Sequence, residues 1–164
     1  MAEISLIAAI SSNWVIGNKG KLPWHIEEDL KYFHNKTNGK YVIVGGNTFR
    51  NTSRKIWEDK KVLILSNDKK LDLPVFNIRR FDSAYVLREY LNKINEEVFV
   101  VGGEQLYKLF LPYAKNIYLT TVFAVVEGDA RFPFFDTRKW IRSMNIQGQG
   151  KNPKYSFNKF VRNA

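Results

Sequence analysis

Cysteine is absent from the 164 residues of this sequence, and its absence excludes disulfide bonds, thiolate nucleophiles and cysteine-bound metal ions. Long apolar runs are absent as well. The apolar stretch within residues 1–7 is too short for the core of a signal peptide, no basic residue precedes it, and no later run has the length of a membrane span. We therefore expect a soluble cytoplasmic protein with no membrane partner and no metal site.

Acidic residues are scarce relative to basic ones: 16 Asp and Glu stand against 26 Lys and Arg, a formal net charge of +10. Such an excess favours anionic partners. The basic residues are scattered as short pairs such as Lys60-Lys61 and Arg79-Arg80, with no RNA-binding signature or basic helix. We expect a phosphate-bearing cofactor or a polyanionic small substrate and no nucleic acid, although excess lysine on a solvated surface requires no partner at all.

The order of the apolar segments predicts an α/β fold. Hydrophobic residues make up 45% of the chain, enough for the core of one domain over residues 1–164. Apolar runs predict strands at 4–10, 41–44, 61–65, 75–78, 98–101 and 116–123, and helical spacing predicts helices after residue 24, within 83–95 and after residue 103. We expect a mostly parallel central sheet flanked by helices, with a C-terminal antiparallel hairpin over 140–161 and a cleft at the carboxyl ends of the strands.

One acidic residue in segment 22–33 stands out. If a helix begins after residue 24, one face of it carries Ile26, Asp29, Leu30 and Phe33. Asp29 is therefore the one carboxylate on the apolar face, whereas Glu27 and Glu28 are predicted to point outward. An acid near a helix N-terminus can simply offset the helix dipole, for about 0.3 to 1 kcal/mol. The functional alternative is that the partner of Asp29 arrives as a ligand, because an unpaired buried carboxylate is costly.

Two strands run directly into paired glycines. Residues 41–44 are followed by Gly45-Gly46-Asn47-Thr48, and residues 98–101 by Gly102-Gly103-Glu104-Gln105. Free backbone N–H groups at such turns attract phosphate. Each turn is a weak signal alone and neither has the full Gly-x-Gly-x-x-Gly spacing, but together they would serve one long dinucleotide. Between the first strand and the helix, residues 11–21 are predicted to form a long irregular loop of the kind that often acts as a lid.

In their order and spacing these motifs resemble the dihydrofolate reductase family over nearly the whole chain. Any one of them is unremarkable, and only residues 50–60 fail to align cleanly. The motifs are Ile7-Ala8-Ala9-Ile10, Val15-Ile16-Gly17, Leu22-Pro23-Trp24, Asp29-Leu30 with Phe33, Thr48, Leu65-Ser66, Val101-Gly102-Gly103 with Tyr107, Leu111-Pro112, Tyr118-Leu119-Thr120, and Glu127-Gly128-Asp129 with Phe132-Pro133.

The resemblance implies reduction of 7,8-dihydrofolate to tetrahydrofolate by hydride transfer from NADPH, in support of one-carbon metabolism and thymidylate synthesis. It implies that Asp29 holds the amino group and ring N–H of the pterin, that Thr120 hydrogen-bonds Asp29, and that Trp24 holds a nearby water. A monomer with antifolates as inhibitors is also implied. The remaining substrate pocket would be lined by Ile7, Ala8, Leu30, Phe33, Ile56, Val101 and Tyr107.

The same resemblance implies a cofactor site. The nicotinamide would lie against Ala9, Ile16, Gly17 and Tyr107, closed over by the loop that carries Leu22. Further cofactor contacts would come from Gly46, Asn47, Thr48, Leu65, Ser66, Asn67, Arg80, Gly102, Gly103, Glu104, Gln105 and Leu106. In family members the peptide bond between the glycines that match 102 and 103 is usually cis.

The sequence departs from the family pattern at two subsites. Where the family carries residues that grip the cofactor's 2'-phosphate, this chain has the uncharged Gly46, Asn47, Asn67 and Gln105. Arg50, Arg79 or Arg80 could substitute from adjacent turns, so NADPH is the expected cofactor, with NADH as an alternative. The Arg that binds the glutamate tail of folate is matched by Lys60, or by Lys61 if the gap moves by one residue, and Arg54 is another candidate for the tail contact.

Two rival functions fit parts of the pattern. The pyrimidine reductase of riboflavin synthesis has a related fold and uses NADPH, but it would not be expected to carry the segment from Trp24 to Asp29 in this form. A basic, non-catalytic binding protein on the same fold would explain the charge and the lost phosphate contacts. The retention of Asp29, Trp24, Thr120 and the second glycine turn argues against it.

Overall fold

The computed structural model describes residues 1–71, 73 and 77–164. The strands are β1 (Glu3–Ser11), β2 (Val15–Gly17), β3 (Tyr41–Gly45), β4 (Lys61–Leu65), β5 (Ile78–Phe81), β6 (Glu97–Gly102), β7 (Asn116–Val122), β8 (Ala130–Arg131), β9 (Trp140–Gln147) and β10 (Tyr155–Arg162). The α-helices are α1 (Glu27–Thr37), α2 (Gly46–Arg50), α3 (Ala84–Leu91) and α4 (Glu104–Phe110). Short 3-10 turns are η1 (Arg54–Trp57), η2 (Leu111–Tyr113) and η3 (Thr137–Lys139).

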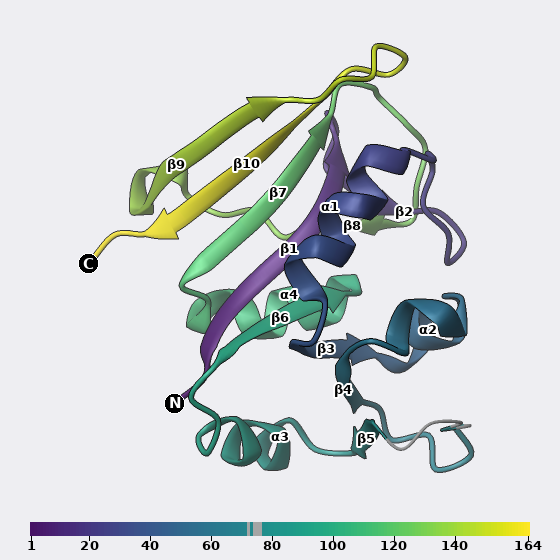
Figure 1. Ribbon diagram of the computed structural model, residues 1–164, viewed down its shortest axis with the longest axis vertical. Helices are drawn as coiled ribbons and strands as arrows, with labels where there is room; N and C mark the ends of the chain where they lie inside the picture. Colours follow the sequence, from purple (N-terminus) through teal and green to yellow (C-terminus); the bar gives the residue numbers. More distant parts are fainter. Residues whose placement is uncertain (72, 74–76) are drawn as a thin grey trace.

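The main sheet has the strand order β5-β4-β3-β6-β1-β7-β10-β9, and β10 runs antiparallel to both of its neighbours (Figure 1). The expected mostly parallel sheet with a C-terminal antiparallel hairpin is therefore confirmed. β1 lies between β6 and β7, where both its faces are covered, and this explains its mainly apolar sequence, in which Ser5 is the polar exception between Ile4 and Ile10. Of the strand predicted at 75–78, residues 75 and 76 lie outside the described residues, and β5 continues to Phe81.

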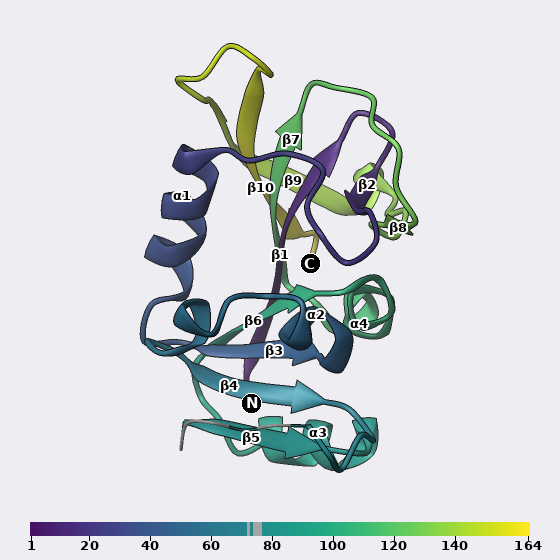
Figure 2. The same ribbon diagram turned by 90° about the vertical axis from the view of Figure 1, so that its right-hand side faces the viewer.

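Helices cover the sheet on both faces: in Figure 2, α1 lies on the left of β1 and α4 on its right. On one face, α3 and α4 pack through Leu87, Leu91 and Phe110 against side chains of β1, β6 and β7. On the other, α1 and η1 lie over the alternate side chains of β3, β4 and β6. Because side chains alternate along a strand, the sheet contributes to both cores at once.

The predicted apolar face of helix α1 packs inward, as its spacing indicates. Ile26 is buried against Tyr155 and Phe157 of the hairpin, and Phe33 packs on the sheet. One expectation about this helix is wrong. Glu28 does not point away from the protein, because its Oε1 accepts hydrogen bonds from the Tyr155 hydroxyl at 2.6 Å and the Gln149 backbone N–H at 2.8 Å. The hairpin folds back over the start of α1, a contact that the local pattern does not encode.

Residues 11–21 are more regular than predicted. β2 pairs antiparallel with β8, more than a hundred residues further along the chain. The Asn13 amide donates to the Val126 carbonyl at 2.8 Å, and the Arg131 guanidinium donates to the Asn13 carbonyl at 2.9 Å. This long-range pairing turns the expected irregular loop into a two-stranded element beside the main sheet.

Within the described ranges, none of the helices combines the length and the apolar character that crossing a bilayer would need. Ser83 is the N-cap of α3, and its side chain accepts a hydrogen bond from the Val86 backbone N–H.

Candidate active site

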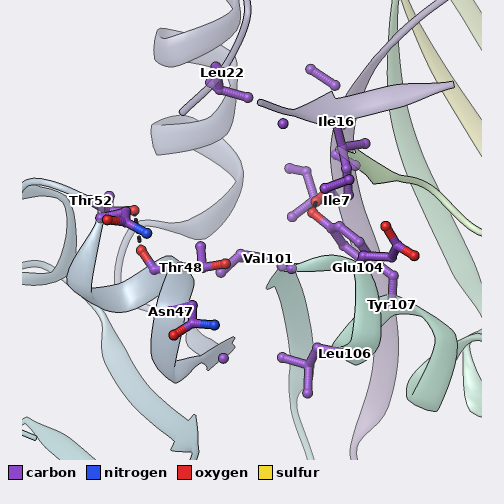
Figure 3. Close-up of a pocket in the computed structure, with 18 of the residues that line it drawn as sticks. Ile7, Ile16, Leu22, Asn47, Thr48, Thr52, Val101, Glu104, Leu106 and Tyr107 are labelled. Atoms are coloured by element: carbon purple, nitrogen blue, oxygen red, sulfur yellow. Dashed lines mark hydrogen bonds between the residues drawn. The ribbon is translucent and has the colours of Figure 1, made fainter. Parts of the chain in front are cut away.

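A cavity of about 720 Å³ lies at the carboxyl ends of β1, β3, β4 and β6. Strand ends of a mostly parallel sheet are where an open α/β fold leaves space for a ligand. In the close-up of Figure 3, Asn47 and Thr48 from α2 lie across the cavity from Glu104 and Tyr107 of α4, with Val101 of β6 between them. The volume is in the range of sites that bind small molecules and cofactors.

Asp29 and Thr120 meet at one end of this cavity. The Thr120 hydroxyl donates to Asp29 Oδ1 at 2.7 Å, across a sequence separation of 91 residues. Burial raises the pKa of Asp29 above its ordinary value, and the hydrogen bond from Thr120 works in the opposite direction. Each carboxylate oxygen has two lone pairs, so Asp29 can still accept hydrogen bonds from a ligand.

Two aromatic side chains near this end have polar atoms that are buried without a hydrogen-bond partner in the described part of the chain: Trp24 Nε1 and the Tyr32 hydroxyl. Burial, followed by the charge of Asp29, raises the pKa of Tyr32 to about 12, so its hydroxyl keeps its proton at neutral pH. Tyr32 stacks on Phe157 with ring centroids 4.5 Å apart. Tyr32 lines the cavity, so its hydroxyl is a donor available to a polar ligand or to water there.

The two glycine turns face each other. A Cβ at Gly45 would lie 3.7 Å from the Gly102 carbonyl oxygen, and one at Gly103 would lie 3.0 Å from Thr48 Oγ1. Gly102 has a φ of +129°, a backbone conformation that residues other than glycine rarely adopt. The Gly102–Gly103 peptide bond is cis, as the family resemblance implied. The turns form a narrow cradle that any side chain at 103 would partly fill, and this fits a backbone approached closely by a cofactor.

Tyr107 ties the second turn to the central strand. Its hydroxyl donates to the Ile7 carbonyl at 2.7 Å, and complete burial raises its pKa well above the ordinary value. The neighbouring Ala8 and Ala9 have small side chains and also line the cavity, so the strand leaves room for a flat ligand. The cavity wall beside these two alanines is apolar, and a ligand can easily displace water from such a surface.

The open side is bordered by the β2 and β8 segments. Ile16, Gly17 and Leu22 line the cavity there, together with Asp129 and Ala130. The Asp129 carboxylate accepts hydrogen bonds from the Lys19 backbone N–H at 3.1 and 3.2 Å. Leu22 is 51% exposed, so this edge presents an apolar side chain to solvent that a bound ligand would cover.

One end of the cavity carries the Asp29 carboxylate, which can accept from N–H donors, and the other end is formed by the two glycine turns. Apolar side chains line the cavity between these two ends. The described residues contain no group of three or more acidic or histidine side chains that could hold a metal ion. The arrangement suits a flat heterocycle held at Asp29 next to a long cofactor that lies along the glycine turns.

Comparison with known proteins settles the family. A family model described as dihydrofolate reductase matches residues 3–162. The dihydrofolate reductase of Buchnera aphidicola subsp. Acyrthosiphon pisum is 34% identical over 95% of this chain and 94% of its own, and that of Bacillus subtilis is 35% identical over 92% and 88%. This chain belongs to the dihydrofolate reductase family.

A solved structure agrees at the level of the fold. The dihydrofolate reductase from Enterococcus faecalis, complexed with NADP(H) and RAB-propyl, superposes with a TM-score of 0.86 at 26% identity, covering 99% of this chain and 97% of that one. The chain therefore has the dihydrofolate reductase fold.

Most residues predicted for the site line the cavity. They come from separate parts of the chain, which the fold brings to one edge of the sheet. They are Ile7, Ala8, Ala9, Ile16, Gly17, Leu22, Asp29, Leu30, Phe33, Gly46, Asn47, Thr48, Ile56, Leu65, Val101, Gly102, Gly103, Glu104, Gln105, Leu106, Tyr107 and Thr120.

Trp24, Lys60, Ser66, Asn67 and Arg80 are outside this lining set. Trp24 packs with the hairpin cluster that contains Ile26. The Lys60 side chain is fully buried behind the ring of Phe33, and its Nζ donates to Asp59 at 2.6 Å. Lys60 therefore needs to leave Asp59 before it can meet a carboxylate in the cavity.

Several lining residues were missed by the sequence analysis, among them Tyr32, Thr52 and Asp129. Helical spacing could have found two of them, since Tyr32 is three residues after Asp29 and Thr52 is four residues after Thr48. The Thr52 hydroxyl donates to the Thr48 carbonyl at 2.6 Å. Asp129 belongs to the Glu127-Gly128-Asp129 motif, but its place at the cavity follows from the β2–β8 pairing, which no local pattern encodes.

Proposed function

We propose that this protein reduces 7,8-dihydrofolate to 5,6,7,8-tetrahydrofolate with NADPH as the reductant. The observation that carries the proposal is the Asp29–Thr120 pair, buried at one end of a cavity whose other end is built from the two glycine turns. A carboxylate there accepts the neighbouring N–H donors of a pterin. The membership of the chain in the dihydrofolate reductase family supports the same substrate.

Asp29 binds and orients the substrate in this proposal. Its ionised carboxylate accepts from the pterin amino group and the adjacent ring N–H, two charge-assisted hydrogen bonds in one plane. The Thr120 hydroxyl holds Oδ1 in place for that geometry. Leu30, Phe33 and Ile56 would pack against the rest of the substrate, since all three line the same apolar wall.

The reaction transfers a hydride to the pterin, which also takes up one proton at N5 from solvent. NADPH supplies the hydride when it is bound. The chain's own contribution is close approach and exclusion of bulk water, which Ala9, Ile16 and Tyr107 provide around the point where the two rings would meet. We propose that Trp24 and Tyr32 donate to a water that delivers the proton; in support of this, their buried polar atoms have no partner in the described ranges.

The cofactor would extend from that point across the cradle of Thr48, Gly102 and Gly103. Gln105 and Leu106 continue the same wall into α4. The far end reaches Leu65, and beyond it Ser66, where the Arg80 guanidinium donates to the Ser66 carbonyl at 2.8 Å. We propose NADPH as the preferred cofactor and NADH as a slower substitute. Arg50 and Arg80 lie near the far end of the cofactor site, but the positions with which the family grips the 2'-phosphate are uncharged in this chain.

The test is the loss of reduced-nicotinamide absorbance with dihydrofolate, run in parallel with NADPH and NADH. We expect turnover with NADPH that collapses in Asp29→Asn and persists in Glu28→Gln, a neighbouring acid outside the cavity lining. No turnover by folded wild-type protein with either cofactor would refute the proposal. Equal loss of activity in both variants would show that the effect is not specific to the carboxylate in the cavity.

A further inference from the structure

Three charged side chains meet just beyond the cavity, at the carboxyl ends of β4 and β5; we call them the Arg50–Asp68–Arg80 cluster. Arg50 Nη2 lies 2.5 Å from Asp68 Oδ2, and Arg50 Nη1 donates to Asn47 Oδ1 at 2.7 Å. Arg80 Nη1 donates to the Ser66 carbonyl at 2.8 Å. The third candidate cation, Arg79, lies over the rings of Phe81 and Tyr90, away from this cluster.

The cluster adjoins the cavity through Gly46, which lines it. A Cβ at Gly46 would lie 2.7 Å from Ser66 Oγ and 3.7 Å from Arg50 Nη2. The hydroxyl of Ser66 leaves no room for a side chain at 46, and the guanidinium of Arg50, one helical turn later, lies at van der Waals distance from the same point. Arg50 therefore places a positive charge beside Gly46, which has no side chain of its own to carry one.

Asp68 offsets that charge. Its side chain is 37% exposed and that of Arg50 is 41% exposed, so the ion pair contributes little to stability and the guanidinium can change partners at small cost. The Lys70 backbone N–H, at 2.9 Å from Oδ1, and then the Arg50 guanidinium hold the pKa of Asp68 below its usual value. The carboxylate is ionised at neutral pH and repels any second anion that approaches Arg50.

We propose that Asp68 is a specificity-determining residue that weakens discrimination between phosphorylated and unphosphorylated nicotinamide cofactors. Its carboxylate already forms an ion pair with the Arg50 guanidinium, the group with which a 2'-phosphate would pair. The 2'-phosphate therefore adds less binding free energy than it would if Arg50 and Arg80 were there without Asp68. This inference rests on the proposed function, because it assumes that the cofactor's adenosine end lies beside Gly46 and Leu65.

The test is equilibrium binding of NADP⁺ and of NAD⁺, measured by titration calorimetry on wild type, Asp68→Asn and Arg50→Gln. Asparagine keeps an acceptor for the Lys70 N–H while removing the charge. In Asp68→Asn we expect the preference for NADP⁺ over NAD⁺ to rise roughly fivefold, the size of one partly exposed charge interaction. In Arg50→Gln we expect the preference to fall by a similar factor, with the affinity for NAD⁺ unchanged.

The exposed pair formed by Arg138 and Asp136, with Nη2 and Oδ2 2.9 Å apart, offers matched controls. Asp136→Asn and Arg138→Gln make the same changes in net charge away from the cavity lining, and both should leave the preference unchanged. If Asp68→Asn leaves it unchanged, or the controls shift it equally, the inference is overturned while the proposed function stands. If the folded wild type binds neither nucleotide, the proposed function and the inference both fail.

Discussion

Glu28 and Asp29 are neighbouring acids with opposite pKa shifts, and neutralising each should change stability in opposite directions. The pKa of Asp29 is raised, mainly by burial. The pKa of Glu28 is lowered, first by the hydrogen bond from the Tyr155 hydroxyl and then by that from the Gln149 N–H. We therefore expect Asp29→Asn to stabilise the protein at neutral pH and Glu28→Gln to destabilise it.

The sign follows from proton linkage. A raised pKa means that the folded state binds more protons than the unfolded state between the two pKa values, so the stability of the wild type falls as the pH rises from the unfolded pKa of Asp29 through its folded pKa. Removing that charge should raise the free energy of unfolding at pH 7 by about 1 kcal/mol, as is common for functional-site substitutions. For Glu28 the contribution is present above its unfolded pKa and is lost as the pH falls through the folded pKa.

Activity should respond in the reverse order. In Asp29→Asn two hydrogen bonds to the pterin lose their charged acceptor, and the side-chain amide would point a donor at another donor. At about 1.5 to 3 kcal/mol for each charge-assisted bond, the loss in kcat/KM should be roughly a hundredfold to ten-thousandfold. Glu28→Gln should retain most of its activity, because Glu28 contacts the hairpin and not the cavity.

The assay is thermal unfolding of wild type and both variants between pH 3 and pH 8, with steady-state kinetics at neutral pH. The Asp29→Asn and wild-type curves should converge as the pH falls below the unfolded pKa of aspartate, about 3.9, because wild-type Asp29 is then protonated. A variant Asp29→Asn that is less stable than wild type at pH 7 would refute the reasoning, since it would show that the buried carboxylate is stabilising when no ligand is bound.

Three further predictions concern the cavity wall and the core. Tyr107→Phe should lower the free energy of unfolding by about 1 to 2 kcal/mol in denaturant titrations, because the Ile7 carbonyl loses its donor at 2.7 Å; an unchanged midpoint would contradict this. Gly103→Ala should raise the KM for NADPH while leaving that for dihydrofolate unchanged, since its Cβ would press on Thr48 Oγ1 at 3.0 Å. Leu87→Ala should cost about 2 to 5 kcal/mol of stability because the side chain is 0% exposed, with both KM values preserved.

Local periodicity was sufficient for much of the fold. The apolar run of β1 predicted a central strand, and the spacing of residues in α1 predicted that Asp29 lies on the buried face. The two glycine turns were visible because glycine directly after a buried strand is a local feature. The matching of dispersed motifs to one family then identified most of the cavity lining, including Thr120, which no local pattern connects to Asp29.

Other contacts depend on pairings that no short segment encodes. The β2–β8 ladder brings Asp129 to the cavity, and the hairpin brings Tyr155 to Glu28. Asp68 was not predicted to face Arg50, although the sequence analysis had noted Arg50 as a candidate cation. Lys60, aligned with the tail-binding position, is held by Asp59 outside the cavity lining.

The sequence by itself determined which segments form strands and helices, which face of α1 is buried, and where glycine lets the backbone approach closely. These properties depend on residues a few positions apart, and the period of a helix or strand fixes them. Only the tertiary structure decided which other polar side chains meet: Tyr155 with Glu28 and Asp68 with Arg50. Electrostatic and hydrogen-bond energies depend on separations of a few ångströms, and the packing of distant segments sets those separations.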